Sequence, residues 1–469
     1  LGKSQVSQYV SGKTVPRSDI LHFLADVLQV DPDWLLAKDS TVNYTADTVS
    51  DPAESFSDPS AASLSQTKTG GSPMREFKKS SKLDNVLYDV RGPVVEEANR
   101  MEACGTQVLK LNIGNPAPFG FRTPDEVIYD MSHQLTDCEG YSPSQGLFSA
   151  RKAIMQYAQL KKLPNVSIDD IYTGNGVSEL INLCMSALLD DGDEILIPSP
   201  DYPLWTACAT LAGGKAVHYI CDEQSEWYPD IDDMRKKITD RTKAIVIINP
   251  NNPTGAIMER EDLEAIAKIV EEKDLFVISD EIYSELTYKG NPVSITQIPG
   301  MRERTVLING FSKAYAMTGW RLGYACGPEV ILKQMLKIHQ FAIMCAPTTS
   351  QYAAVEALKN GDDDVAEMRE QYNQRRRYLL HAFAEMGLPC FEPYGAFYVF
   401  PCIKEFGMTS DEFATRFLQE EKVAVVPGTA FGDSGEGYIR ISYAYSLENL
   451  KVAIGRLSHF VKKLKAEKE

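Results

Sequence analysis

The sequence has little of what marks several large protein classes. Its nine cysteines include no C-x-x-C pair, which argues against a structural zinc site and against a disulfide-built scaffold. Its six histidines show no metal-ligand spacing, so no metal site and no Ser-His-Asp triad is predicted. No apolar run approaches the ~18 residues of a membrane-spanning helix. These absences favour a reducing compartment such as the cytoplasm, away from the membrane.

Positive charge is also scarce. Lys and Arg total 48 against 65 Asp and Glu, which gives a net charge of −17. Such an acidic chain is a poor partner for nucleic acid or for an anionic membrane, although it can still hold a local basic pocket. Hydrophobic residues make up 43% of the chain and charged residues 24%, values that exclude wholesale disorder.

Composition divides the chain into a short front part and a long α/β part. Residues 4–36 have apolar residues at helical spacing and are expected to form short helices. Residues 40–73 are rich in Ser and Thr, so we expect a flexible linker there, with a loop packed on the core as the alternative. From about residue 79 onward, short apolar runs alternate with amphipathic helices, which predicts a layered domain with a largely parallel sheet.

Polar side chains follow several of these apolar runs. The expected strands lie at 194–198, 243–248, 275–279, 305–310 and 321–326, and an expected helix lies at 259–273. Ligands of such sheets bind at the carboxyl ends of the strands. Three successive runs bring chemistry-bearing residues to that edge, namely Asn252, Asp280, Tyr283, Lys313 and Arg321. Each alone has a structural explanation such as a salt bridge, but their shared edge indicates a site.

A glycine-rich turn in IYTGNGVSEL (171–180) is a second candidate. It opens a helix at Gly176, Val177 and Ser178, where free N–H groups attract a phosphate. The pattern equally fits a plain turn with a helix cap. Tyr202 follows the next expected strand and is either a ligand contact or a surface aromatic.

Together these motifs resemble the fold-type-I, class I aminotransferases, which use pyridoxal 5′-phosphate (PLP). The resemblance is carried by NPNNPTG (249–255), SDEIY (279–283) and SKAYAMTGWRLGY (312–324). More narrowly, NIGNPAPFGF (112–121) and KSSKLDNVLYDVRGPVVEEA (79–98) are similar to bacterial glutamate–pyruvate (alanine) aminotransferases. The resemblance covers roughly residues 75–465.

That family implies an α/β fold in two domains. A large PLP-binding domain with a mostly parallel seven-stranded sheet is expected over 121–345, and a smaller α/β domain over 79–120 and 346–469. A small all-α appendage at 1–38 and a flexible linker at 39–78 are expected to precede them.

The resemblance also implies roles around the cofactor. Lys313 carries PLP as a covalent imine and shuttles the proton, while Asp280 keeps the pyridine nitrogen protonated. Tyr283 and Asn252 hydrogen-bond the ring hydroxyl, and Tyr202 stacks on the ring. The phosphate contacts are expected from Gly176, Val177, Ser178 and Arg321.

Further expected contacts involve a second subunit and the substrate. Tyr141, in EGYSPSQGL (139–147), reaches the phosphate of a neighbouring subunit, which implies a homodimer. Arg440, in YIRISYA (438–444), binds the substrate carboxylate with its planar fork, beside Asn252 and the backbone of Gly114. Tyr88 and Arg91 close over the substrate, although a surface salt bridge competes as the explanation of Arg91.

One position departs from the family pattern. Many relatives have a serine three residues before the lysine, where this chain has Gly310, and Ser312 directly precedes Lys313 instead. One phosphate contact is therefore expected to be missing or replaced. The second half of the chain also resembles the aspartate-type enzymes, so alanine and aspartate transaminase activity both stay open.

The expected reaction moves the amino group of alanine or a similar amino acid to a 2-oxo acid, with 2-oxoglutarate and glutamate as the expected couple. Two alternatives remain. Residues 4–36 resemble the latter part of a phage-repressor-type helix-turn-helix, so the chain could be a transcription regulator with an aminotransferase-like sensor domain. DNA binding is not expected, because residues 1–40 carry four basic against five acidic side chains. The other alternative is a PLP-dependent C–S β-lyase.

Overall fold

The computed structural model describes residues 77–84, 86, 92–116, 120–290 and 292–468. The helix-turn-helix expected in 4–36, most of the expected linker, and both Tyr88 and Arg91 lie outside the described residues. Among the helices that are described, none is long and apolar enough to cross a membrane.

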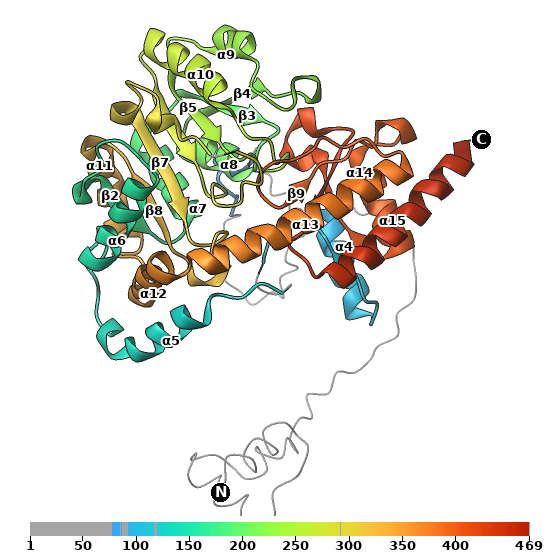
Figure 1. The fold of residues 1–469 in the computed structure, drawn as a ribbon. Helices are drawn as coiled ribbons and strands as arrows, with labels where there is room; N and C mark the ends of the chain where they lie inside the picture. The colour runs from blue at the N-terminus through green and yellow to red at the C-terminus, as the bar shows by residue number, and fades with distance from the viewer. Residues whose placement is uncertain (1–76, 85, 87–91, 117–119, 291, 469) are drawn as a thin grey trace, which may run out of the picture. The chain divides into compact units, whose positions relative to one another are not determined.

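A seven-stranded sheet lies at the centre of the larger of two α/β parts of the described chain (Figure 1). Its strand order is β2-β8-β7-β6-β5-β3-β4; β8 runs antiparallel to both neighbours, and the other adjacent pairs are parallel. This confirms the predicted mostly parallel sheet. The strands are β2 (Ile171–Gly174), β3 (Glu194–Ser199), β4 (Lys215–Ile220), β5 (Thr242–Ile248), β6 (Phe276–Asp280), β7 (Thr305–Gly310) and β8 (Gly323–Cys326).

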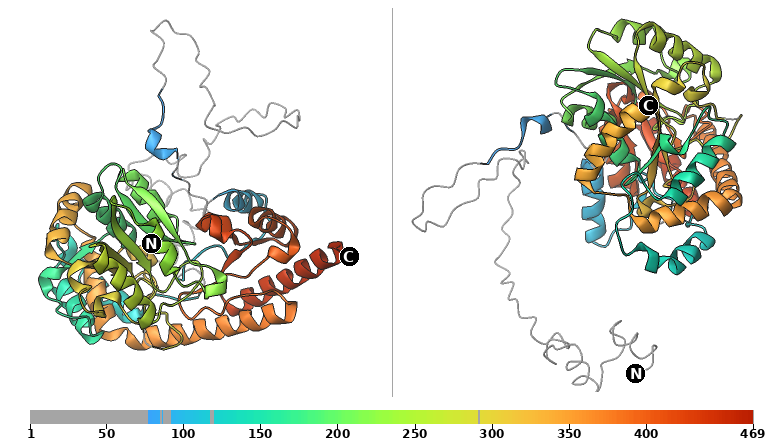
Figure 2. Two further views of the ribbon diagram at one scale, coloured as in Figure 1. Left: turned by 90° about the horizontal axis from the view of Figure 1, so that it is seen from above. Right: turned by 90° about the vertical axis from the view of Figure 1, so that its left-hand side faces the viewer.

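Helices cover both faces of this sheet, as the two views in Figure 2 show. In β5, Val246 and Ile248 pack with α7, α8 and α11, while Ile245 and Ile247 pack with α9 and α10 on the other face. Burial on both faces explains why these strands read as continuous apolar runs. The helices are α5 (Asp125–His133), α6 (Phe148–Leu160), α7 (Val177–Leu188), α8 (Leu204–Leu211), α9 (Ile231–Lys237), α10 (Arg260–Glu272), α11 (Glu329–Ala342) and α12 (Thr348–Asn360).

A smaller α/β part joins segments from both halves of the described chain. Strand β1 (Leu109–Lys110) pairs with β10 (Val423–Ala424), and β11 (Val426–Pro427), β12 (Ile439–Ser442) and β9 (Tyr398–Val399) form an antiparallel sheet. Around them lie α4 (Pro93–Ala103), α14 (Ser410–Glu421) and α15 (Leu447–Lys468). The long helix α13 (Asp362–Met386) runs from α12 beside the large sheet into this smaller part (Figure 1).

Candidate active site

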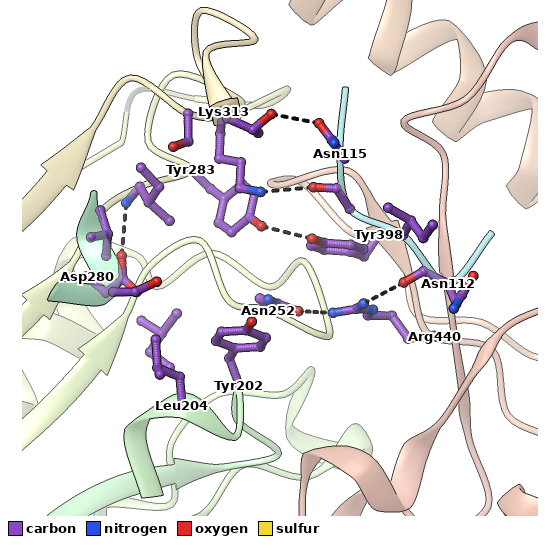
Figure 3. A pocket seen from close by; sticks show the side chains of 18 of the residues that line it. Asn112, Asn115, Tyr202, Leu204, Asn252, Asp280, Tyr283, Lys313, Tyr398 and Arg440 are labelled. Carbon is purple, nitrogen blue, oxygen red and sulfur yellow. Dashed lines mark hydrogen bonds between the residues drawn. The ribbon is translucent and has the colours of Figure 1, made fainter. Parts of the chain in front are cut away.

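A cavity of about 640 Å³ opens at the carboxyl ends of β5, β6 and β7 (Figure 3). Segments as far apart in sequence as α4 and β12 contribute to its wall. Ten of the residues predicted from the sequence line it, namely Gly114, Val177, Ser178, Tyr202, Asn252, Asp280, Tyr283, Lys313, Arg321 and Arg440.

Lys313 lies in the turn that follows β7 and points into the cavity. Its Nζ donates a hydrogen bond to the carbonyl oxygen of Gly114 at 2.9 Å. Burial, together with the guanidinium groups of Arg440 and Arg321, lowers the pKa of this amine to about 8, against the opposing effect of Asp280. An amine with this pKa is partly neutral near pH 7 and can act as a nucleophile.

Asp280 is the last residue of β6 and is only 7% exposed. Burial raises the pKa of its carboxyl to about 7, against the opposing effects of the Ile282 N–H, which donates at 3.2 Å, and of Lys313. No cationic side chain among the described residues forms an ion pair with it. A protonated ring nitrogen placed against this carboxylate would supply the missing partner.

Arg440 on β12 is 3% exposed and also has no carboxylate partner among the described residues. Its Nη1 donates to Oδ1 of Asn252 at 2.8 Å and its Nη2 to the Asn112 carbonyl oxygen at 3.2 Å, while its buried Nε has no partner in the part of the chain that the structure describes. The guanidinium lies 4.3 Å from the ring centroid of Tyr398. A buried cation of this kind fits a carboxylate, which it can grip with two parallel hydrogen bonds.

Two tyrosines close the cavity beside Gly114. The hydroxyl groups of Tyr283 and Tyr398 are hydrogen-bonded at 2.9 Å, and burial raises the pKa of Tyr283 well above its ordinary value, so it stays neutral and can donate. A Cβ on Gly114 would lie 2.1 Å from the Tyr398 hydroxyl oxygen. A residue with a Cβ would therefore need Tyr398 to shift, and glycine lets this backbone pass close to that phenol.

The start of α7 forms a basic end of the cavity. Its N-cap residue Gly176 has a φ of +77° and no side-chain cap, which leaves N–H groups of the first turn free for an anion. A Cβ at Gly176 would lie 2.6 Å from Nη2 of Arg321, so the guanidinium sits against this turn. Together the helix dipole and Arg321 fit a phosphate group.

The departure at position 310 has a steric explanation. A Cβ on Gly310 would lie 2.9 Å from the Leu322 carbonyl oxygen, because β7 and β8 pair at this point. A serine there would need the backbone to shift. Ser312, two residues further along the chain, lines the cavity.

Other predicted residues are not brought to the cavity. Gly176, the N-cap of α7, lies against the Arg321 guanidinium but is not itself a lining residue, and Tyr141 is 87% exposed and does not line the cavity. Sequence reasoning missed several lining residues, namely Asn112, Asn115, Thr318 and Tyr398. The first two lie in the NIGNP motif and could have been found there, whereas Tyr398 belongs to an apolar run with no polar signal.

Comparison with known proteins agrees with this site. The profile of the family "Aminotransferase class I and II" matches residues 106–457. Glutamate-pyruvate aminotransferase AlaA of Haemophilus influenzae is 44% identical over 403 residues, which are 83% of this chain and 99% of that protein. An aminotransferase structure from Escherichia coli has a TM-score of 0.79 at 42% identity, over 83% of this chain and 99% of that one. The alanine aminotransferase structure from Pyrococcus furiosus has a TM-score of 0.79 at 37% identity, over 82% of this chain and 100% of that one.

Proposed function

The chain belongs to the class I and II aminotransferases, a PLP-dependent family, and we propose that it transfers the amino group of alanine or a similar amino acid to a 2-oxo acid. The proposed couple is 2-oxoglutarate and glutamate. A relative named glutamate-pyruvate aminotransferase, 44% identical over nearly its whole length, supports this choice. The observation that carries the proposal is the convergence of Lys313, Asp280 and the unpaired Arg440 on one cavity.

The residues of the cavity fit PLP from one end to the other. The unpaired carboxyl of Asp280 suits a protonated pyridine nitrogen, and the start of α7 with Arg321 and Ser312 suits the phosphate. Tyr202 lines the cavity where it can cover a ring face. When bound, PLP supplies the electron sink that stabilises negative charge at the substrate α-carbon.

The chain's own residues then orient the substrate and move its proton. We assign Arg440 to the substrate α-carboxylate, with Asn252 holding the guanidinium in place through its Oδ1. Asn252 still has its NH2 group to donate, and Tyr283 its hydroxyl, toward the ring oxygen of the cofactor. Lys313, whose pKa is depressed, would hold the aldehyde carbon of the cofactor through its amine; once the substrate amine has displaced it, the freed amine would remove the proton from the substrate α-carbon as a general base.

A homodimer with shared active sites is part of the proposal. Gly140 accepts a hydrogen bond from Thr348, and Ser142 accepts one from Gln351, so the segment around Tyr141 packs on the start of α12. The start of α12 follows Phe341 and Met344 in the chain, and these two residues are 95% and 47% exposed. An apolar surface of this kind suits a second copy of the chain, whose cavity Tyr141 would then reach.

Two broader assignments complete the proposal. We assign residues 121–345 to a large cofactor-binding domain and residues 79–120 with 346–469 to a small domain.

All nine cysteines are free, which supports a reducing compartment such as the cytoplasm.

A panel of amino donors tests the function. Purified protein loaded with PLP should be yellow, and L-alanine or L-glutamate should convert it to a form that absorbs at shorter wavelength. Pyruvate or 2-oxoglutarate should restore the original band. Comparing L-aspartate in the same assay ranks the substrates. If PLP is bound and no amino donor bleaches the band, the aminotransferase proposal is wrong; release of ammonia and pyruvate from cystathionine would indicate the β-lyase instead.

A further inference from the structure

The buried side chain of His339 and the partly buried side chain of Glu179 hold the turn before α7. Glu179, the third residue of α7, reaches back with Oε2 to the N–H of Asn175 at 2.6 Å. Its Oε1 lies 3.0 Å from Nδ1 of His339 on α11. The His339 side chain is 2% exposed and that of Glu179 is 13% exposed, and neither residue lines the cavity.

The chemistry of this pair defines the direction of both hydrogen bonds. A carboxylate only accepts, so Nδ1 of His339 carries the hydrogen and donates to Glu179. The other carboxylate oxygen accepts from Asn175, the residue directly before the N-cap Gly176. The position of Asn175 sets where the following N–H groups point, and those groups form the basic end of the cavity.

Packing alone does not account for the pair. Burying a carboxylate and an imidazole costs free energy, and an apolar pair of similar volume would fill the space between α7 and α11 at no such cost. Nε2 of His339 is buried, and no described residue hydrogen-bonds it, which adds to that cost. A carboxylate this close to an anion-binding turn would also repel a phosphate unless a donor such as His339 drew its charge away.

We propose that Glu179 and His339 are positioning residues that preorganise the turn at 174–178 for the phosphate group of PLP. This inference rests on the proposed function, which assigns that group to the start of α7. It concerns the phosphate end alone, because Lys313 and Asp280 hold the other parts of the cofactor.

The test compares PLP with pyridoxal, which lacks the phosphate. The full-length chain, stripped of cofactor, is titrated with each compound and the dissociation constants are read from absorbance and fluorescence. In E179Q and H339L we expect PLP to bind about tenfold more weakly or worse, since E179Q removes the charge on which both hydrogen bonds of residue 179 depend and H339L removes the hydrogen bond from His339. Binding of pyridoxal should change by less than about twofold.

Two further variants serve as rescue and control. His339→Asn places an amide donor near the position of Nδ1 and should restore most of the affinity for PLP. Lys333→Gln lies on the same helix and breaks only an exposed ion pair with Glu329, so it should change neither constant.

The outcomes separate this inference from the proposed function. Equal losses for PLP and pyridoxal, or no loss for PLP, overturn the positioning role. If His339→Leu does not fold, Glu179→Gln carries the same comparison by itself, and His339→Asn should still bind PLP nearly as tightly as wild type. A wild-type chain that binds PLP no better than pyridoxal overturns the assignment of the phosphate to α7, and with it the proposed arrangement of the cofactor.

Discussion

Lys313 and Asp280 face one cavity with pKa values that burial has shifted toward each other. The pKa of the amine falls to about 8 and that of the carboxyl rises to about 7. Burial penalises the charged form of both groups, so each is available in the neutral form near physiological pH. Perturbed pairs of this kind gather at active sites, and the following three predictions depend on single residues.

The first concerns how quickly Lys313 captures PLP. Only the neutral amine reacts, so the capture rate by cofactor-stripped protein should rise with pH and level off above about 8. Stopped-flow absorbance over pH 6–10.5 measures this rate. A rate that keeps rising to pH 10.5, as for an ordinary lysine, would contradict the depressed pKa.

Asp280→Asn should separate stability from activity. The folded-state pKa of Asp280 lies above its unfolded value, so wild type loses stability as pH rises from about 4 to about 7. The variant has no such loss. The free energy of unfolding of its cofactor-free form should exceed that of wild type by on the order of 2–4 kcal/mol at pH 8, and by less at pH 5. Its kcat should fall by about 100-fold or more, because the cofactor ring loses its charged partner.

Denaturant titration at both pH values checks the stability change, and steady-state assays check kcat. An Asp280→Asn protein that is less stable than wild type at pH 8 would show that the carboxylate already has a partner in the cofactor-free chain.

Arg440→Lys should raise the KM for amino donors by about 10- to 100-fold, because a lysine cannot make two parallel hydrogen bonds to a carboxylate. The change also removes the bond to Asn252. Steady-state kinetics with L-alanine and L-glutamate measure it. An unchanged KM for both would place the substrate carboxylate elsewhere.

At the scale of elements, the strands and their ends were predictable, and most of the loops between them were not. The apolar runs at 243–248 and 305–310 correspond to β5 and β7 within a residue, because strands buried on both faces leave a continuous signal. The run at 321–326 becomes a strand only at Gly323, since Arg321 takes a left-handed φ of +53° after a short helical turn. Arg321 therefore lies outside the strand and lines the cavity.

Gly114→Ala tests the close passage between β1 and α5. The added Cβ would lie 2.1 Å from the Tyr398 hydroxyl, so we expect a loss of about 1–3 kcal/mol in unfolding free energy and about tenfold or more in kcat/KM. Gly455→Ala is the matched control: it lies in the exposed face of α15 with nothing within 4 Å of its Cβ, and should stabilise the chain by about 0.5–1 kcal/mol. Wild-type activity in Gly114→Ala would mean that Tyr398 is free to move away.

At the scale of the whole molecule, the site depends on contacts between distant parts of the chain. Ten of its lining residues could be predicted, because each belongs to a short motif whose residues are close together in the sequence. Tyr398 and the carbonyl of Asn112 join it only through the pairing of the small sheets, and no local pattern encodes which distant segment arrives. The roles of Tyr88, Arg91 and Tyr141 stay predictions.

The second copy of the chain is the remaining prediction at this scale. Phe341→Asp places a charge on the exposed apolar surface that precedes α12 in the chain, and should yield monomers with about tenfold weaker PLP binding. Val452→Asp, at an exposed apolar position on α15, should stay dimeric. Sedimentation velocity distinguishes monomers from dimers. A wild-type chain that is monomeric and fully active would contradict the proposal that two copies share their active sites.

The central claim is that Lys313 holds the cofactor by a covalent bond. Borohydride reduction of the PLP-loaded protein makes that bond permanent, and peptide mass mapping then locates it. We expect the pyridoxyl label on the peptide that contains Lys313 and on no other lysine, with no label in Lys313→Ala. A label on a different lysine, or an active protein that takes none, would contradict the account.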